Sequence, residues 1–316
     1  EIKIQKDQLK LNPDGLNSWL NKQNLINLKK ILRAANRIKN DLQNNSVDRA
    51  VKNLGLDITS TLNYTDVLVY ISVYLELIGM KEYRKFEYCV VDESQDFSLL
   101  EYLILNKIVL RGRFALFGDL NQSLENDGVK DWNDIKFVIN DARVANTFSL
   151  EENYRSTKQI IDFANKILRP YTDKYLPKSI DRVGQIPNEI IFSDDEGMVE
   201  AFRKSLSDDL KDIRKSIGII VFESDSITVD TVREILIQEK VDKLENGFVQ
   251  LTSNKKINYT PLGIYLMKSD DCKGLEFSKV YVLNLNLKKI KNYFDARRAF
   301  VSVTRAMNEL QVYGVK

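Results

Sequence analysis

Acidic side chains follow directly on a short apolar run in this sequence. The run Tyr88–Val91 ends in Asp92 and Glu93, and Gln95 and Asp96 come close behind. A strand that carries neighbouring carboxylates to its tip suits nucleotide hydrolysis. One carboxylate can hold Mg²⁺, usually through water, while the other orients or deprotonates the attacking water. Taken alone, such an Asp-Glu pair is more often a solvated strand end.

A second polar group follows the apolar run Phe114–Phe117. It reads Gly118-Asp119-Leu120-Asn121-Gln122-Ser123. The glycine permits a sharp backbone turn, and the amide of Gln122 is able to meet a γ-phosphate or the water that attacks it. The alternative is an ordinary Gly-Asp turn, which is the more frequent case for this pattern by itself.

Three further segments contain arginine or lysine next to residues able to bind a nucleotide. In Glu152–Thr157, Tyr154 could stack on a base and Arg155 could reach a phosphate; the alternative is a helix start capped by Ser156 or Thr157. Lys273–Phe277 lies between two expected strands, and Val303–Ala306 lies in an expected helix. Either of these last two could instead be a surface ion-pair segment.

The elements that must position these groups alternate in type. Before residue 150 we expect a helix capped by Asn63 or Thr65 that stops at Gly79, strands at 88–91 and 114–117, and a helix at 100–109. After it we expect helices at 157–168, 228–238 and 293–307, strands at 217–222, 263–267, 280–283 and 310–313, and an irregular connection over 169–188. This β-α-β alternation predicts parallel sheets, whose ligands bind beyond the carboxyl ends of the strands. Residues 1–62 predict a helical segment with a basic, solvated face.

Composition restricts the chemistry. The 316 residues include no histidine, which excludes Ser-His-Asp and Cys-His catalysis and histidine-bearing metal sites. The two cysteines, Cys89 and Cys272, form no CxxC pair, which fits a reducing cytoplasm and argues against a zinc site. A net charge of +2 is too small to identify a nucleic-acid partner. No apolar run approaches the ~20 residues of a membrane-spanning helix, so no membrane partner is expected.

In order, the five segments resemble motifs II to VI of the UvrD/Rep/PcrA-like superfamily 1 helicases. They read DESQD, GDLNQSL, NYRST, KGLEF and VTRA, and the resemblance covers Tyr64–Tyr313. It implies an α/β protein with two RecA-like, P-loop NTPase-type domains, the first of them incomplete. The implied domains are a helical segment at 1–62, the remainder of the first RecA-like domain at 63–150, and the second at 151–316 without a large inserted subdomain.

The resemblance also implies a role for each matching residue in binding and hydrolysing ATP with Mg²⁺. Asp92 would help to hold Mg²⁺, Glu93 would be the catalytic carboxylate, and Gln95 and Asp96 would couple the site to movement. Gln122 would sense the γ-phosphate, Tyr154 would stack on adenine, and Arg155 and Arg305 would act as arginine fingers. Glu276 would lie near the ribose and phosphates.

Several departures from the family pattern bear on activity. No G-x-x-x-x-G-K-[ST] phosphate-binding loop occurs in the sequence. We therefore expect the loop upstream of Glu1, in a longer protein, and expect this chain alone neither to bind ATP tightly nor to hydrolyse it. Lys268-Ser269-Asp270 replaces the usual T-x-H, which weakens the inference of tight DNA contact, and Trp132 stands without a W-R-G. Only about 115 residues separate NYRS from KGLEF.

Three functions remain open at this level. The first is part of an ATP-dependent helicase or translocase that moves on single-stranded DNA or at duplex ends in the cytoplasm. The second is a HelD-like ATPase that remodels RNA polymerase, or a helicase subunit of a bacterial defence system acting with a partner such as a nuclease. The third is a helicase-like binding module without hydrolysis, against which the retained acids and arginines argue.

Overall fold

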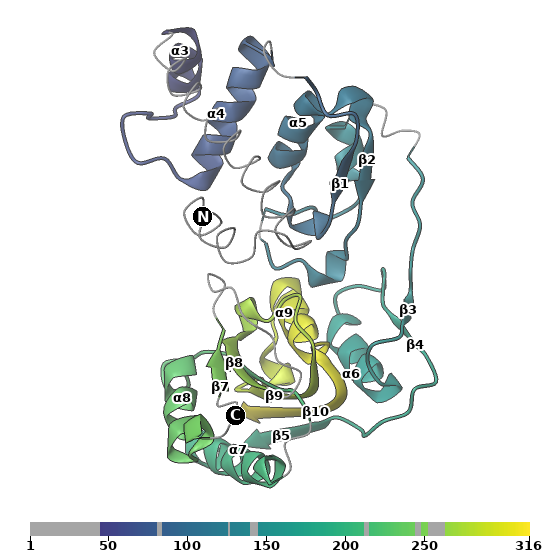
Figure 1. Cartoon of the computed structure of the whole chain (residues 1–316), viewed down its shortest axis with the longest axis vertical. Helices are drawn as coiled ribbons and strands as arrows, with labels where there is room; N and C mark the ends of the chain where they lie inside the picture. The colour runs from purple at the N-terminus through teal and green to yellow at the C-terminus, as the bar shows by residue number, and fades with distance from the viewer. Residues whose placement is uncertain are drawn as a thin grey trace, which may run out of the picture. The chain divides into compact units, whose positions relative to one another are not determined.

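The computed structural model describes residues 45–80, 84–125, 127–139, 145–211, 215–243, 248–251 and 263–316 (Figure 1). Contacts divide them into two compact units. The first comprises the described residues up to Cys89 together with Leu100–Arg113 and the pair at 138–139; the second comprises the others. The helices expected before residue 45 fall outside the described residues, and the domain boundaries expected at residues 62 and 150 stay predictions.

Helices α3 (Asn45–Asn53) and α4 (Tyr64–Leu77) belong to the first unit. Asn63 caps α4 through a reciprocal pair of bonds, because its side chain accepts the Asp66 N–H while the Asp66 carboxylate accepts the Asn63 N–H. Gly79 follows the helix with a φ of +72°, a conformation that glycine adopts without strain. The predicted cap and stop of this helix are both confirmed.

Strands β1 (Cys89–Val91) and β2 (Phe114–Leu116) pair with each other and are joined by α5 (Leu99–Ile108). Cys89 N–H donates to Arg113 O at 3.0 Å, and Phe117 N–H donates to Val91 O at 2.9 Å. Residue numbers rise together along both strands, as they do in a parallel pair. The predicted β-α-β order is confirmed, and the two polar turns follow the carboxyl ends of adjacent strands.

A parallel sheet of six strands forms the centre of the second unit, which confirms the predicted α/β class. Its order is β5-β10-β9-β6-β8-β7, and every neighbouring pair runs parallel. The strands are β5 (Asn188–Phe192), β6 (Ile217–Val221), β7 (Phe248–Gln250), β8 (Ile264–Lys268), β9 (Phe277–Leu283) and β10 (Ala306–Val315). Strands β5 and β7 were not expected from the sequence.

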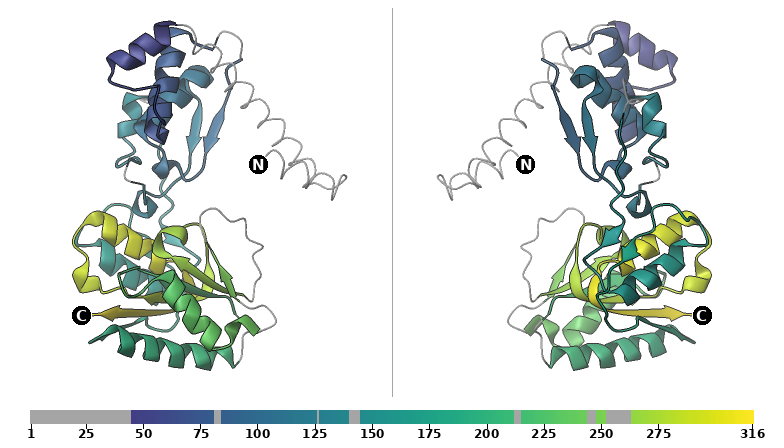
Figure 2. Two further views of the ribbon diagram at one scale, coloured as in Figure 1. Left: turned by 90° about the vertical axis from the view of Figure 1, so that its left-hand side faces the viewer. Right: turned by 90° about the vertical axis from the view of Figure 1, so that its right-hand side faces the viewer.

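Helices cover both faces of this sheet. The helices α6 (Lys158–Leu168) and α9 (Tyr293–Val303) pack on one face, and α7 (Asp195–Leu210) and α8 (Val229–Gln238) pack on the other (Figures 1 and 2). Strand β6 shows why: Ile219 faces α7 and α8, while its neighbour Ile220 faces α6 and α9, and both are fully buried. Each such side chain contributes about 1.5–3 kcal/mol through its burial.

The helix expected over 293–307 is too long. Helix α9 ends at Val303, where the Thr304 hydroxyl donates to the carbonyls of Phe300 and Val301. From Ala306 onward the backbone is bound into β10, which lies between β5 and β9. Residue 305 therefore sits in the turn between a helix and a strand. The VTRA segment, expected inside a helix, instead lies across this turn, because its last residue, Ala306, is already paired with Phe277 of β9.

No helix in the described part of the chain combines the length and apolarity that crossing a membrane requires. A further parallel pair, β3 (Glu152–Asn153) with β4 (Lys178–Ser179), connects the start of the NYRST segment to the irregular stretch predicted over 169–188. Within that stretch only β4 is regular before β5 begins at Asn188.

Candidate functional site

Asp92 and Glu93 stand at the carboxyl end of β1 with exposed side chains. Glu93 has left-handed backbone angles (φ 50°, ψ 37°), which are uncommon for a residue other than glycine. Its N–H is accepted by the Asp92 carboxylate at 2.9 Å, and the short helix η1 (Ser94–Asp96) begins directly after it. The tight turn presents both carboxylates at the sheet edge and leaves the other Asp92 oxygen open to a cation.

Gln95 connects the two polar turns. Its side chain is fully buried; Nε2 donates to Glu93 Oε2 at 2.7 Å, and Oε1 accepts the Asp119 N–H at 3.0 Å. A Cβ atom on Gly118 would lie 2.2 Å from Gln95 Oε1, so any larger residue would displace the Gln95 amide from its present position. The sequence predicted Gly118 for a sharp turn, whereas the structure requires it for this close approach.

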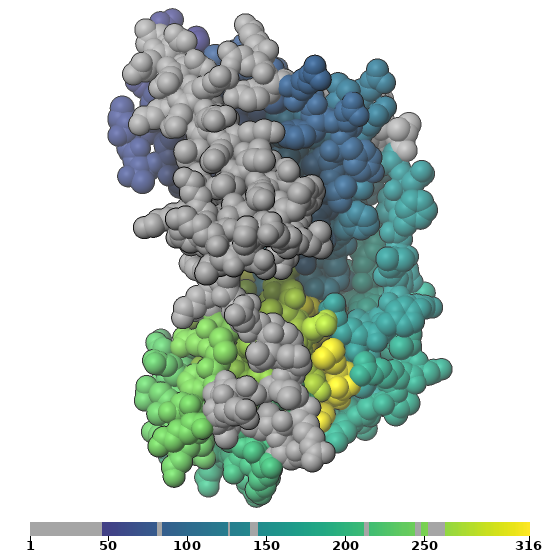
Figure 3. All heavy atoms as spheres, viewed as in Figure 1, coloured from purple at the N-terminus to yellow at the C-terminus, as the bar shows by residue number. Residues whose placement is uncertain are grey.

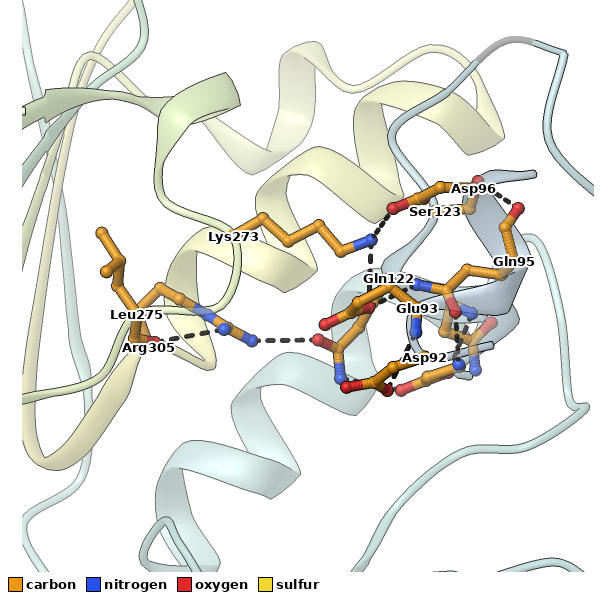
Figure 4. Close-up of polar contacts among 11 residues, drawn as sticks. Asp92, Glu93, Gln95, Asp96, Gln122, Ser123, Lys273, Leu275 and Arg305 are labelled. Carbon is orange, nitrogen blue, oxygen red and sulfur yellow. Dashed lines mark hydrogen bonds and ion pairs between the residues drawn. The ribbon is translucent and has the colours of Figure 1, made fainter. Parts of the chain in front are cut away.

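Lys273 joins the acids of the first turn. Its Nζ lies 3.2 Å from Glu93 Oε2 and forms a second ion pair with Asp96 Oδ2, while only 17% of its side chain is exposed (Figure 4). Burial by itself would raise the pKa of Glu93, but the Gln95 hydrogen bond and the Lys273 charge outweigh burial and lower it. Glu93 is thus held as a carboxylate.

Asp119 and Gln122 form the second half of the site. Asp119 Oδ1 accepts the Asn121 N–H, and Asp119 Oδ2 accepts Gln122 Nε2, both at 2.9 Å. The buried Asn121 side chain anchors this turn, because it accepts the Tyr293 hydroxyl of α9 at 2.8 Å. Burial raises the pKa of Asp119, although the Gln122 and Asn121 bonds oppose that shift. The free oxygen of the Gln122 amide then points to Arg305.

Arg305 is 2% exposed and is held by neutral oxygens. Its guanidinium donates to Val301 O at 2.9 Å, Leu275 O at 3.1 Å and Gln122 Oε1 at 3.1 Å (Figure 4). Within the described ranges no carboxylate forms an ion pair with it, and burial lowers its pKa. A buried cation without a paired carboxylate is suited to attract an anion such as a phosphate.

Arg155 and Tyr154 lie at the surface. Arg155 Nε pairs with Glu276 Oε2 at 2.7 Å, and the two side chains are 47% and 49% exposed. Both charges act on Arg305, so the pair lies near the guanidinium. Tyr154 is 68% exposed and donates to Glu152. The teal part of the chain around β3 and β4 stands at the surface in Figure 3. The structure thus brings the Arg155–Glu276 pair close to Arg305 and leaves the Tyr154 ring open.

The donor set fits Mg²⁺ with nucleotide better than a metal held by protein alone. Among the described residues no group of three or more His, Cys, Asp or Glu side chains could hold a metal ion. Mg²⁺ usually takes one or two carboxylates and completes its shell with water and substrate phosphates. Asp92 can supply such a carboxylate, while Arg155 and Arg305 provide charge that matches the phosphates.

Two residues at the centre of this network received no role of their own from the sequence. Lys273 was noted only as the first residue of KGLEF, and Asp119 only as part of a Gly-Asp turn. The sequence indicates only that some cation is needed there, since Glu93 and Asp96 stand three residues apart and would repel each other; it does not indicate that Lys273 provides it. No local signal pointed to the bonds that Asp119 forms on both sides.

Two departures from the family pattern have structural explanations. Asp270 pairs with Arg298 at 2.8 Å, and Arg298 also donates to Ser269 Oγ at 2.7 Å, so the acid at this position belongs to an ion pair. Trp132 is partly buried, and its ring edge would meet a Cβ on Gly118 at 3.0 Å. This packing against the second polar turn favours the structural interpretation of the tryptophan over base stacking.

Part of the chain is similar to curated DNA helicases. The chain is 36% identical over 98 residues to the ATP-dependent DNA helicase PcrA of Leuconostoc citreum. It is 30% identical over 117 residues to PcrA of Staphylococcus aureus strain Mu50, and 33% identical over 98 residues to PcrA of Bacillus subtilis strain 168. These alignments cover 31–36% of this chain but only 13–16% of each relative. They relate part of the chain to superfamily 1 helicases.

Comparison with solved structures finds helicases as well. The C-terminal domain of a possible DNA helicase from Lactobacillus plantarum WCFS1 is 23% identical, with a TM-score of 0.37 over 52% of this chain and 88% of that one. The arterivirus nonstructural protein 10 helicase is 17% identical, with a TM-score of 0.37 over 72% of this chain and 38% of that one. No model of a known protein family matches the chain.

Proposed function

We propose that this chain is the part of an ATP-dependent superfamily 1 DNA helicase or translocase that carries motifs II to VI. The observation that supports this most is a convergence of distant segments. Arg305 reaches Gln122 across 183 positions of sequence, and Lys273 reaches Asp96 across 177. Four polar segments with no local reason to meet share one network, as a hydrolytic site built from separate motifs requires.

In the proposed hydrolysis of ATP, the acidic and the basic residues of the site have different roles. Glu93 is the base that orients or deprotonates the attacking water, and Asp92 holds Mg²⁺ through water. Arg305 and Arg155 stabilise negative charge that develops on the transferred phosphoryl group. Arg305 is already fixed by its hydrogen bonds and needs little rearrangement during the reaction. Bound ATP with Mg²⁺ supplies the phosphoanhydride that is cleaved.

The roles expected of the other matching residues belong to the same proposal. Gln122 senses the state of the phosphate through Arg305, to which it is already bonded. Gln95 and Asp96 transmit that state toward Glu93 and Lys273. The open ring of Tyr154 stacks on adenine, and Glu276 lies near the ribose and phosphates after Arg155 turns from it toward the nucleotide.

Movement on single-stranded DNA is proposed from the PcrA relatives, which are named ATP-dependent DNA helicases. Hydrolysis removes charge that bridges cationic and acidic segments, so the contacts around Arg305 and Arg155 loosen and re-form in each cycle. Coupling of this cycle to a bound strand would drive translocation. The phosphate-binding loop, absent from these 316 residues, must come from another segment of the complete protein.

The test uses the full-length protein that contains this chain. The wild type should hydrolyse ATP faster when single-stranded DNA is added. Glu93→Gln should keep ATP binding and lower kcat by roughly 10²–10⁴, the range for loss of a general base. Binding is measured with a fluorescent ATP analogue, and turnover by phosphate release.

Glu125→Gln is the matched control, since Glu125 is an exposed carboxylate in the connection after Ser123. It should turn over like the wild type. The proposal fails if the full-length wild type has no DNA-stimulated ATPase, or if Glu93→Gln retains the wild-type kcat. Stimulation by RNA polymerase in place of DNA would favour the remodelling function instead.

A further inference from the structure

The carboxylate of Asp119 sits between the acid and the arginine ends of the site. On one side the backbone N–H of Asp119 donates to Gln95 Oε1 at 3.0 Å, and Gln95 Nε2 in turn donates to Glu93 at 2.7 Å. On the other side its Oδ2 accepts Gln122 Nε2 at 2.9 Å, and Gln122 Oε1 accepts Arg305 Nη2 at 3.1 Å. One residue thus fixes two glutamine amides.

We infer that Asp119 is a positioning residue that sets the orientation of the Gln122 amide and thereby holds Arg305 in place. A carboxylate can only accept hydrogen bonds, so Gln122 must turn its NH₂ group toward Asp119. The amide oxygen is then left facing the guanidinium, which can only donate. The order of donors and acceptors from Asp119 through Gln122 to Arg305 therefore follows from the negative charge of Asp119.

The opposite amide orientation would break this chain of contacts. The Gln122 NH₂ group would face Arg305 Nη2, so two donors would meet at a 3.1 Å separation. Arg305 is 2% exposed, and water could not readily replace the lost acceptor. An unsatisfied donor in such a place is costly, so the guanidinium would leave its present position.

Asp119 also has an ordinary structural role, which must be separated from positioning. Its Oδ1 accepts the Asn121 N–H at 2.9 Å and caps the short helix η3 (Leu120–Gln122). Asparagine caps helices about as well as aspartate. If capping were the whole role, Asp119→Asn would change nothing at Arg305.

The test reverses the donor–acceptor order in two steps. Asp119→Asn keeps an oxygen for the cap and places an NH₂ group against Gln122, which must flip and present its own NH₂ to Arg305. Gln122→Glu places a carboxylate against Asp119 and repels it. In the double variant, donors and acceptors alternate again, because the new carboxylate at position 122 accepts from the new amide at position 119 and from Arg305. Asp119→Asn should therefore displace Arg305 when position 122 is glutamine, but not when position 122 is glutamate, which offers Arg305 only acceptors.

The readout is the guanidinium ¹⁵N resonances of Arg305 in the 316-residue chain, labelled selectively on arginine. Asp119→Asn should shift these resonances in the wild-type background, whereas adding Asp119→Asn to Gln122→Glu should leave them close to those of Gln122→Glu alone. Asp131→Asn is the matched control, because Asp131 accepts the N–H two residues ahead at 2.9 Å in the same way but has no glutamine partner. It should leave Arg305 unchanged.

A kinetic arm, which rests on the proposed function, uses the full-length protein. Asp119→Asn should lower kcat about ten-fold or more, as the loss of a charged hydrogen bond predicts, whereas the control Asp131→Asn should keep the wild-type kcat. Unchanged Arg305 resonances in Asp119→Asn, or equal shifts from Asp119→Asn in the wild-type and Gln122→Glu backgrounds, would overturn the inference. Absence of ATPase in every protein would count against the proposed function alone.

Discussion

At the scale of single residues, the cations of the site differ in how their charge is compensated. Lys273 contacts two carboxylates, those of Glu93 and Asp96. Arg305 donates to neutral oxygens, which are those of two backbone carbonyls, the Gln122 amide and the Thr304 hydroxyl. The lysine therefore has a structural task in this conformation, holding two like charges together, whereas the arginine keeps positive charge available for an anion. This contrast indicates a stabilising role for Lys273 and is consistent with the role in phosphate recognition that is proposed for Arg305.

Lys273→Met should destabilise the chain more than loss of a surface ion pair does. It leaves Glu93 and Asp96 close together without a cation, and 17% exposure of Lys273 gives water limited access. We expect the free energy of unfolding to fall by about 1–2 kcal/mol, between the values for exposed and buried ion pairs. Urea unfolding at neutral pH measures it.

Lys268→Met provides the comparison. Lys268 pairs with Glu223 at 2.6 Å, but it is 49% exposed and its pair is open to solvent. The expected change is below about 1 kcal/mol and should shrink in high salt. Equal losses for the two variants would show that Lys273 does not hold the acids together.

At the scale of elements, the interior of the sheet was predictable and its edges were not. Strands β6, β8 and β9 are nearly continuous apolar runs because both of their faces are covered by helices. The edge strands β5 and β7 are only partly buried, so their sequences lack such a run. Helix α7 was missed as well, since only three of its sixteen residues are buried.

The contacts of the candidate site could not be predicted to the same degree as its residues. The carboxyl ends of β1 and β2 were expected to present Asp92 and Gln122, because polar residues follow apolar runs there. The prediction that Arg305 lies inside a helix was wrong. Pairing of β10 with its neighbouring strands ends α9 at Val303, earlier than the helical pattern of the sequence indicates. Pairings between residues 177–183 positions apart have no local signal.

Asp209→Asn should weaken the attachment of α7 to the sheet. Asp209 accepts Lys279 Nζ at 2.7 Å and the Tyr281 hydroxyl at 2.6 Å, and the Asp209 and Lys279 side chains are 12% and 6% exposed. Lys279 keeps a second carboxylate, Glu309, at 3.5 Å. We therefore expect the free energy of unfolding to fall by about 2 kcal/mol at pH 7, which is less than the full cost of breaking a buried ion pair.

This loss should depend on pH. Burial alone would raise the pKa of Asp209, but bonds from Lys279 and Tyr281 lower it below its ordinary value. The stability that the carboxylate provides is present above the unfolded-state pKa, about 3.9, and is lost as pH falls through the folded-state value. The difference between wild type and variant should thus shrink in acid. Lys211 also lowers the pKa of the exposed Asp208, but because that pair is screened by solvent, Asp208→Asn should show a much smaller pH-dependent difference.

At the scale of the whole molecule, the proposed catalytic groups gather in one compact unit. Asp92, Glu93, Gln122, Arg155 and Arg305 all belong to the second unit, although their segments span most of the described sequence. The site therefore does not depend on the placement of the first unit. What it lacks is a phosphate cradle, since no G-x-x-x-x-G-K-[ST] occurs in the 316 residues.

The 316-residue chain should therefore bind ATP with a Kd weaker than about 1 mM, equivalent to roughly −4 kcal/mol, and should not turn it over. A P-loop supplies several backbone N–H groups and a lysine to the phosphates. The cations of this chain replace little of that, because Lys273 and Arg155 are already paired with carboxylates. Titration of a fluorescent ATP analogue with Mg²⁺ measures the affinity, and phosphate release in the presence of single-stranded DNA measures turnover. The full-length protein under the same conditions is the positive control. Turnover by the isolated chain that disappears in Glu93→Gln would mean that its own residues hold the phosphates by a means other than a P-loop.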